Sequence, residues 1–94
     1  MLNTYIEKSS TISISAQVSN DCVIGAKTEI EANCNIIQSC IGPNCKIGKN
    51  VKIINSLIDS HVIIEDNCTI QNAILQSHVT LRKGCIISKG AMIS

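Results

Sequence analysis

Along most of the chain, an aliphatic residue recurs at every sixth position, and the residues between are largely polar. The recurrence divides the sequence into blocks of six that begin with Ile, Leu or Val, such as IGAKTE at 24–29 and IGKNVK at 47–52. Ten such blocks can be aligned under one another. So short a period is typical of a solenoid, in which each repeat packs only on its neighbours.

Three positions of the block have distinct structural roles. Position one is aliphatic and position five is small or β-branched, so we expect both to point into the interior. The residues at position five are Cys22, Thr28, Cys34, Cys45, Val51, Val62, Cys68, Val79, Cys85 and Ala91. Position four carries residues that mostly tolerate a positive φ, which predicts that the chain turns there. These residues are Asp21, Lys27, Asn33, Asn44, Asn50, His61, Asn67, His78, Gly84 and Gly90.

Three segments are one residue shorter than a block, and they set a longer repeat of 17 residues. They are IIQSC at 36–40, IINSL at 53–57 and IQNAI at 70–74. The aliphatic first positions then fall into three columns with a step of 17, namely 24, 41, 58, 75, then 30, 47, 64, 81, then 36, 53, 70, 87. One coil therefore has three sides. The sequence predicts an all-β, single-stranded parallel β-helix whose coils stack about 4.8 Å apart through backbone hydrogen bonds.

The repeat predicts one β-helix domain of about five coils of 17 to 18 residues, over residues 12–94. Residues 1–11 fit the repeat poorly and are expected to form an N-terminal lead-in or cap. At its other end the sequence has just started a new block at residues 92–94, so the last coil is expected to be uncapped. Because an uncapped solenoid exposes its apolar cross-section, we expect homo-association through the solenoid ends.

Composition supports a narrow interior and restricts the partners. Hydrophobic residues make up 45% of the chain, yet it has no Phe, no Trp and one Tyr. Stacked Ile and Val fill a slender column, whereas a broader core normally uses aromatic side chains. A formal net charge of +1 argues against binding to nucleic acid or anionic lipid. Short apolar runs and the lack of a signal-peptide pattern predict no membrane association and a cytoplasmic location.

The six cysteines could suggest a metal site, but their spacing favours core packing. In the predicted columns Cys34, Cys68 and Cys85 share one corner and Cys45 a second, while Cys40 shares a third with Leu57, Ile74 and Ala91. Each thiol then stands for a small buried hydrophobic residue. No disulfide scaffold is expected in a chain without a secretion signal.

The two histidines, His61 and His78, are 17 residues apart and are expected to stack in adjacent coils at the turn position. A histidine there could act as a general base, although a polar turn residue is the simpler interpretation.

The glycines that follow a first aliphatic are part of the repeat and form no phosphate loop. The segment Asn67-Cys68-Thr69 matches the N-glycosylation sequon, but we assign it no function. We predict no catalytic, cofactor-binding or metal-binding residue, and we expect the outward basic residues to be solvated. These are Lys46, Lys49, Lys52, Arg82, Lys83 and Lys89.

Blocks that read aliphatic, Gly or acidic, two variable residues, small, variable resemble the hexapeptide repeats of acyltransferases and sugar-nucleotide pyrophosphorylases. The resemblance covers residues 12–94 and implies a left-handed β-helix, against the usual right-handed crossover. It also offers one candidate function, as the β-helix domain of such an acyltransferase or pyrophosphorylase. In a trimeric acyltransferase we would expect a long loop insertion and a histidine that faces a groove between chains, and the sequence has no such loop.

The stretch VSNDCVIGAKTEIEANCNIIQSCIGPNCKIGKNVKIINSLI at 18–58 is similar, almost block for block, to the β-helix of the epsilon subunit of eukaryotic translation initiation factor two-B. That subunit belongs to a guanine-nucleotide exchange factor, and its nucleotidyltransferase-like and catalytic HEAT-repeat domains are not expected within these 94 residues. The resemblance implies a scaffold without catalytic residues or cofactors, which contacts other subunits of the exchange factor, especially a gamma-like subunit. The last coil, LRKGCIISKGAMIS, would suit a gamma subunit or a guanylyltransferase about as well.

Overall fold

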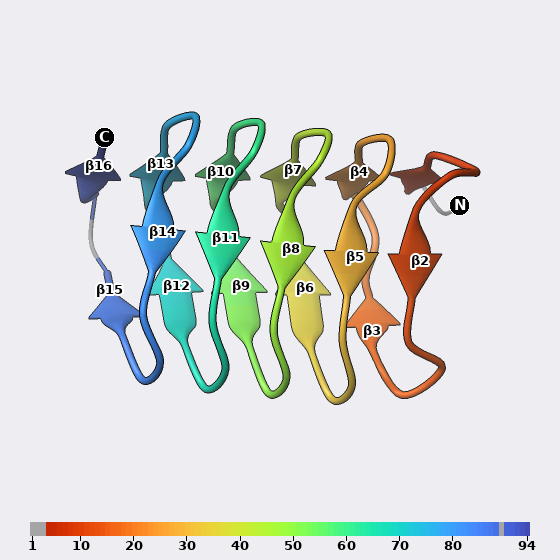
Figure 1. The fold of residues 1–94 in the computed structure, drawn as a ribbon, viewed down its shortest axis with the longest axis horizontal. Coiled ribbons are helices and arrows are strands. Elements are labelled where there is room, and N and C mark those ends of the chain that lie inside the picture. Colours follow the sequence, from red (N-terminus) through yellow and green to blue (C-terminus); the bar gives the residue numbers. More distant parts are fainter. Residues whose placement is uncertain (1–3, 89) are drawn as a thin grey trace.

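The computed structural model describes residues 4–88 and 90–94, which form sixteen short β-strands and no helix (Figure 1). The strands belong to three parallel sheets, each making one side of a prism. Sheet A contains β1 (Tyr5–Ile6), β4 (Val23–Ile24), β7 (Cys40–Ile41), β10 (Leu57–Ile58), β13 (Ile74–Leu75) and β16 (Met92–Ile93). Sheet B contains β2 (Thr11–Ile12), β5 (Glu29–Ile30), β8 (Lys46–Ile47), β11 (Ile63–Ile64) and β14 (Thr80–Leu81). Sheet C contains β3 (Gln17–Val18), β6 (Asn35–Ile37), β9 (Lys52–Ile54), β12 (Thr69–Gln71) and β15 (Ile86–Ile87).

The strand register confirms the repeat of 17 residues. In sheet A, Ile24 pairs with Ile41 and Ile41 with Ile58, and the same step joins the middle strands of sheets B and C. The first strand pair of each sheet, and the last pair of sheet A, have a step of 18. Consecutive strands lie on different sides and never pair with each other, so each sheet grows by one strand per coil. The architecture is the predicted left-handed parallel β-helix of about five coils.

The interior is a stack of aliphatic side chains, as predicted from positions one and five. The isoleucines at positions 24, 36, 47, 53, 64 and 70 are at most 1% exposed. Among the residues at position five, Thr28 is the one that carries a hydroxyl group, and it is buried. Its Oγ1 donates to the Gly42 carbonyl at 2.8 Å and accepts from the Cys45 N–H at 3.3 Å, so it is satisfied inside the prism.

The turns confirm the prediction for position four, where all ten residues have a positive φ. The structure adds three further positive-φ residues in the short segments, at Gln38, Asn55 and Asn72. They lie in one corner, one coil apart, and Asn55 Nδ2 donates to Asn72 Oδ1 at 2.7 Å. The five-residue segments thus turn through the same left-handed conformation as the six-residue blocks, at the third residue from the inward aliphatic instead of the fourth.

The predicted interior position of Cys40 is wrong, because Cys40 is exposed and begins strand β7. In the short segments the residue after the positive-φ turn points inward, and it is Ser39, Ser56 or Ala73. The next residue points outward because side chains alternate along a strand, so a shift of one residue reverses the face. Cys40 does share a column with Leu57 and Ile74, but the last coil contributes Met92 to it and not Ala91.

The segment predicted as an N-terminal lead-in or cap contains β1, which pairs in register with β4 through Tyr5 and Val23. From Tyr5 onward this segment therefore has the backbone pairing of a coil. Residues 1–3 and Lys89, one of the predicted outward basic residues, lie outside the described part of the chain. Over the described residues, no helix is long and apolar enough to cross a membrane.

Candidate interaction surface

The outer face of sheet A carries an unbroken row of apolar side chains. In each two-residue strand of this sheet, the second residue points inward and the first points outward. The outward residues lie in register from one coil to the next. They are Tyr5, Val23, Cys40, Leu57, Ile74 and Met92, and we call them the apolar ladder. Tyr5 is 58%, Leu57 48% and Met92 62% exposed, so the ladder is a solvent-facing surface along the full length of the prism.

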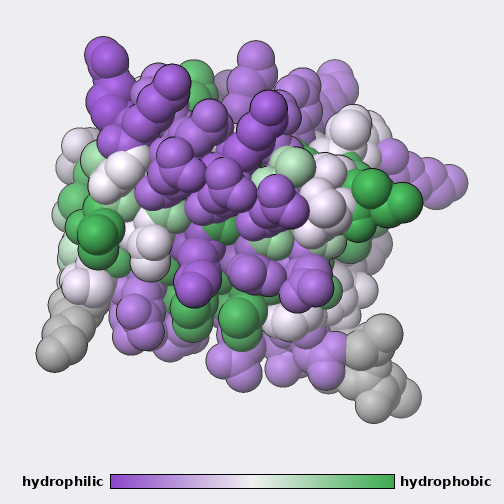
Figure 2. Space-filling model, turned by 90° about the horizontal axis from the view of Figure 1, so that it is seen from below, coloured by the Kyte–Doolittle hydropathy of each residue, from purple (hydrophilic) through white to green (hydrophobic). Residues whose placement is uncertain are grey.

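The other two sides of the prism have mixed outer faces. The outward residues of sheet B are Thr11, Glu29, Lys46, Ile63 and Thr80, and those that begin the strands of sheet C are Gln17, Asn35, Lys52, Thr69 and Ile86. Figure 2, seen from below, looks onto the side of sheet C, where hydrophilic side chains surround a few separate hydrophobic ones. Among the described residues, a continuous apolar row therefore distinguishes sheet A from sheets B and C.

Polar corners flank the apolar ladder on both edges. On the edge that faces sheet C lie the amide residues Gln38, Asn55 and Asn72, which line a shallow hollow of about 420 Å³ that extends onto Leu57 and Ile74. The corner between sheets A and B carries the two histidines. This arrangement, an apolar centre with hydrogen-bonding groups at its edges, is the anatomy of a protein–protein contact surface.

The histidines stack as predicted, with the ring centroids of His61 and His78 4.9 Å apart and the rings tilted by 32°. Both side chains are exposed, and both residues have a positive φ. Their backbone N–H groups donate to the carbonyls of Pro43 and Ser60, each at 3.1 Å. The structure therefore gives both residues a defined role in turning the chain.

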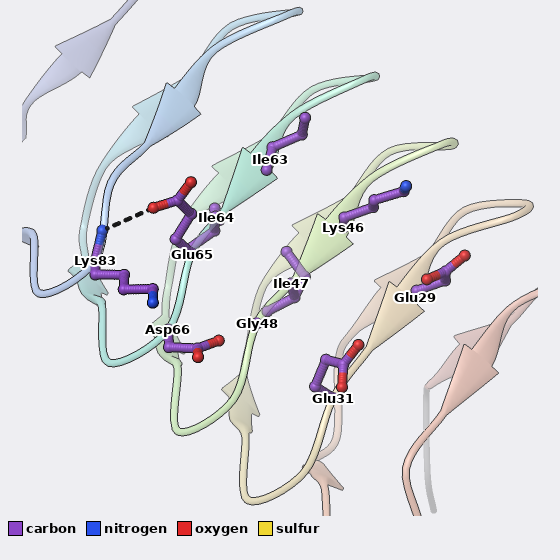
Figure 3. A pocket seen from close by; sticks show the side chains of 10 residues that line it. All are labelled: Glu29, Glu31, Lys46, Ile47, Gly48, Ile63, Ile64, Glu65, Asp66 and Lys83. Carbon is purple, nitrogen blue, oxygen red and sulfur yellow. Dashed lines mark hydrogen bonds between the residues drawn. The ribbon is translucent and has the colours of Figure 1, made fainter.

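A groove of about 290 Å³ on sheet B is lined by charged residues of both signs (Figure 3). Two of its carboxylates hold backbone N–H groups: Glu65 Oε1 accepts from Lys83 at 3.2 Å and Asp66 Oδ1 from Lys49 at 2.8 Å. Gly48 is required beside Asp66, because a Cβ there would lie 2.8 Å from the Asp66 backbone nitrogen. These contacts bind one coil to the next.

The buried cysteines act as packed hydrogen-bond donors. Cys34 Sγ donates to the Gly48 carbonyl at 2.9 Å, Cys45 Sγ to the Asp59 carbonyl at 3.0 Å, and Cys68 Sγ to the Arg82 carbonyl at 3.1 Å. Burial raises the pKa of each of these three thiols, which keeps them protonated and weakly nucleophilic. Over the described residues, no three His, Cys, Asp or Glu side chains gather as a metal site would require.

Sequence reasoning missed the apolar ladder, although its signal is present. Val23, Cys40, Leu57 and Ile74 follow one another with the same step of 17 as the core columns. Each of them stands immediately before an inward aliphatic residue and must therefore face outward. An aliphatic or thiol side chain at every such position departs from the polar exterior that a solenoid side normally has.

Comparisons with known proteins agree with this architecture. The family described as EIF2B subunit epsilon LbH domain matches residues 2–94. Among solved structures, a hexapeptide transferase family protein from Anaplasma phagocytophilum is similar, with 12% sequence identity, a TM-score of 0.50, and coverage of 97% of this chain and 73% of that one. UDP-N-acetylglucosamine O-acyltransferase from Moraxella catarrhalis has 14% identity, a TM-score of 0.34, and coverage of 97% and 65%. No curated protein matches the sequence. At such low identity the first of these structures shows the fold alone.

Proposed function

Because the chain belongs to the family of the EIF2B subunit epsilon LbH domain, we propose that it is the assembly module of a guanine-nucleotide exchange factor in translation initiation. In this role it holds other subunits of the exchange factor, in the first place a gamma-like subunit, and performs no catalysis itself. It works in the cytoplasm and requires neither nucleic acid nor a membrane. The observation that carries the proposal is the apolar ladder, a contact surface as long as the prism itself.

The shape of the prism supports a scaffold role. Its sides meet at tight turns and its interior is filled with stacked side chains, so the outward residues of one side are held at fixed spacing. A surface that is ordered before binding loses little conformational entropy on association. A rigid apolar row with amide groups along its edge therefore suits a lasting subunit contact better than a transient one.

A direct test is a pull-down with purified subunits of the exchange factor. The immobilised chain is expected to retain them, and the gamma-like subunit most strongly. Leu57→Lys places a charge in the middle of the apolar ladder and should reduce the retained amount, whereas Ile63→Lys makes the same change on the outer face of sheet B and should not. Thermal unfolding of both variants, followed by circular dichroism, controls for folding.

The alternative function, as the β-helix domain of an acyltransferase or sugar-nucleotide pyrophosphorylase, makes a different prediction. An exposed histidine such as His61 would then act on an acceptor hydroxyl, and the chain would bind an acyl donor. Isothermal titration with acetyl-coenzyme A distinguishes the two. Saturable binding that is lost in His61→Ala or His78→Ala, together with no retention of exchange-factor subunits, would contradict the assembly role.

A further inference from the structure

We propose that the apolar ladder is also a self-association surface, on which a second copy of this chain packs side to side with its prism axis reversed. This goes beyond the contacts with other subunits proposed above, and it differs from association through the solenoid ends. The occupant is the same surface of the partner, so the contact is closed after two copies and gives a dimer.

The size of the surface fits a dimer interface. The molecule extends over 29 × 22 × 21 Å between Cα atoms. One side of the prism is thus on the order of 600 Å², close to the roughly 800 Å² per partner of a standard interface once side chains widen the footprint. Contiguous exposed apolar rows of this kind often mark protein–protein contact sites.

The spacing of the apolar ladder favours a copy of the chain as the occupant. Its side chains follow one another once per coil, about 4.8 Å apart. A partner that fills the gaps between them along the whole length must present side chains at the same interval. A second β-helix does so by construction, whereas an α-helix, with a pitch of about 5.4 Å, has another interval on its surface.

The order of side chains along the ladder favours the reversed orientation. When the axes run in opposite directions, Cys40 lies opposite Leu57 of the second copy, and Val23 opposite Ile74. Small residues then face larger ones, which fills space evenly, while parallel axes would place each small residue on itself. Reversal also brings together the edges of the two copies that carry Gln38, Asn55 and Asn72, so that Gln38 of one copy faces Asn55 of the other. An amide is both donor and acceptor and can pair with another amide.

Sedimentation velocity over a range of protein concentrations tests the dimer. The wild-type chain is expected to shift from monomer to dimer with rising concentration and to stop at two copies. In Leu57→Lys each interface receives two buried ammonium groups, so we expect a dissociation constant roughly 100-fold higher. Ile63→Lys, a change of the same kind at a similarly exposed position on sheet B, is expected to keep the wild-type value.

Cross-linking through Cys40 tests the orientation. With sheets about 10 Å apart and an offset of about 4.8 Å along the axis, the two Cys40 Cα atoms lie about 11 Å apart, beyond disulfide reach but within that of a short bismaleimide. The reagent is expected to give a covalent dimer in the wild type and in Ile63→Lys, and none in Cys40→Ser or Leu57→Lys. A chain that stays monomeric, trimers, or open-ended oligomers that Leu57→Lys leaves intact would each overturn the proposal. A second copy and another subunit would compete for the apolar ladder, so a chain that stays monomeric but still retains other subunits in the pull-down overturns the self-association alone.

Discussion

Replacing Ser56 by Ala tests whether the corner between sheets C and A depends on a hydroxyl that connects successive coils. Ser56 is 6% exposed, and its Oγ donates to the Ile54 carbonyl at 2.8 Å. The same oxygen accepts from the backbone N–H of Ala73, one coil further on, at 3.2 Å. The Ile54 carbonyl keeps a second donor, the N–H of Asn72 at 3.0 Å. The N–H of Ala73 has no such substitute in the hydrogen bonds of this corner.

The expected loss follows from that one buried donor. Leaving a buried N–H without an acceptor costs about 1–3 kcal/mol, and the gain from a more apolar side chain offsets part of it. We therefore expect the free energy of unfolding to fall by about 1–2 kcal/mol. For a chain of this size the melting temperature should decrease by roughly 4–8 °C for each kcal/mol.

Urea unfolding followed by circular dichroism measures this loss, at one fixed protein concentration so that self-association does not enter the comparison. Ser77→Ala is the matched control, because its hydroxyl is exposed and lies 3.2 Å from that of Ser60; its effect should stay within about 0.5 kcal/mol. Equal stability of Ser56→Ala and Ser77→Ala would refute the role of the corner hydroxyl. A changed m-value would instead indicate a change in compactness.

Three further changes test the core, the turns and the thiols. Ile53→Ala removes a fully buried side chain from the centre of its column and should cost about 2–5 kcal/mol, against about 0.5–1.5 kcal/mol for Ile53→Val, by urea unfolding. Asn50 has a φ of 58°, so Asn50→Ala should lower the free energy of unfolding by about 1–2 kcal/mol while Asn50→Gly, which loses the same amide, costs less. The raised pKa of the Cys45 thiol keeps it protonated in the folded chain when the unfolded chain loses its proton, so stability should be constant below about pH 8 and decrease as the pH rises past 9. Cys45→Val, which matches Val62 and Val79 in its column, should make that decrease smaller when unfolding is compared at pH 7.5 and pH 10.

The three-sided fold could be predicted from the sequence because the interior admits few kinds of side chain. An Ile such as Ile53 must stack on Ile36 and Ile70, so its spacing in the sequence reports the register directly. The left-handed residues at position four were equally readable, because steric limits on φ restrict that position to a few residue types.

The short segments were harder to interpret, and the error at Cys40 came from them. Counting from the first aliphatic residue, as in a full block, places position five at Cys40 and position four at Ser39, whereas the chain turns at Gln38. The amide residues Gln38, Asn55 and Asn72 repeat with a step of 17 and could have marked the turn. When Cys40 is assigned to the interior, Leu57 and Ile74 in the same column are assigned there too, and the outward apolar row of sheet A is not recognised. The candidate contact surface was therefore lost through a shift of one residue.

Hydroxyl-radical footprinting of the chain tests most directly the claim that contacts form on the apolar ladder. Oxidation rates of Leu57, Ile74 and Met92 are compared, by mass spectrometry, with those of Ile63 and Ile86, which are exposed on sheets B and C. As the protein concentration rises through the dimer range, we expect the rates of the first three to fall while those of Ile63 and Ile86 stay constant. Unchanged rates at Leu57 and Ile74, or protection confined to Ile63 in the charged groove, would contradict it.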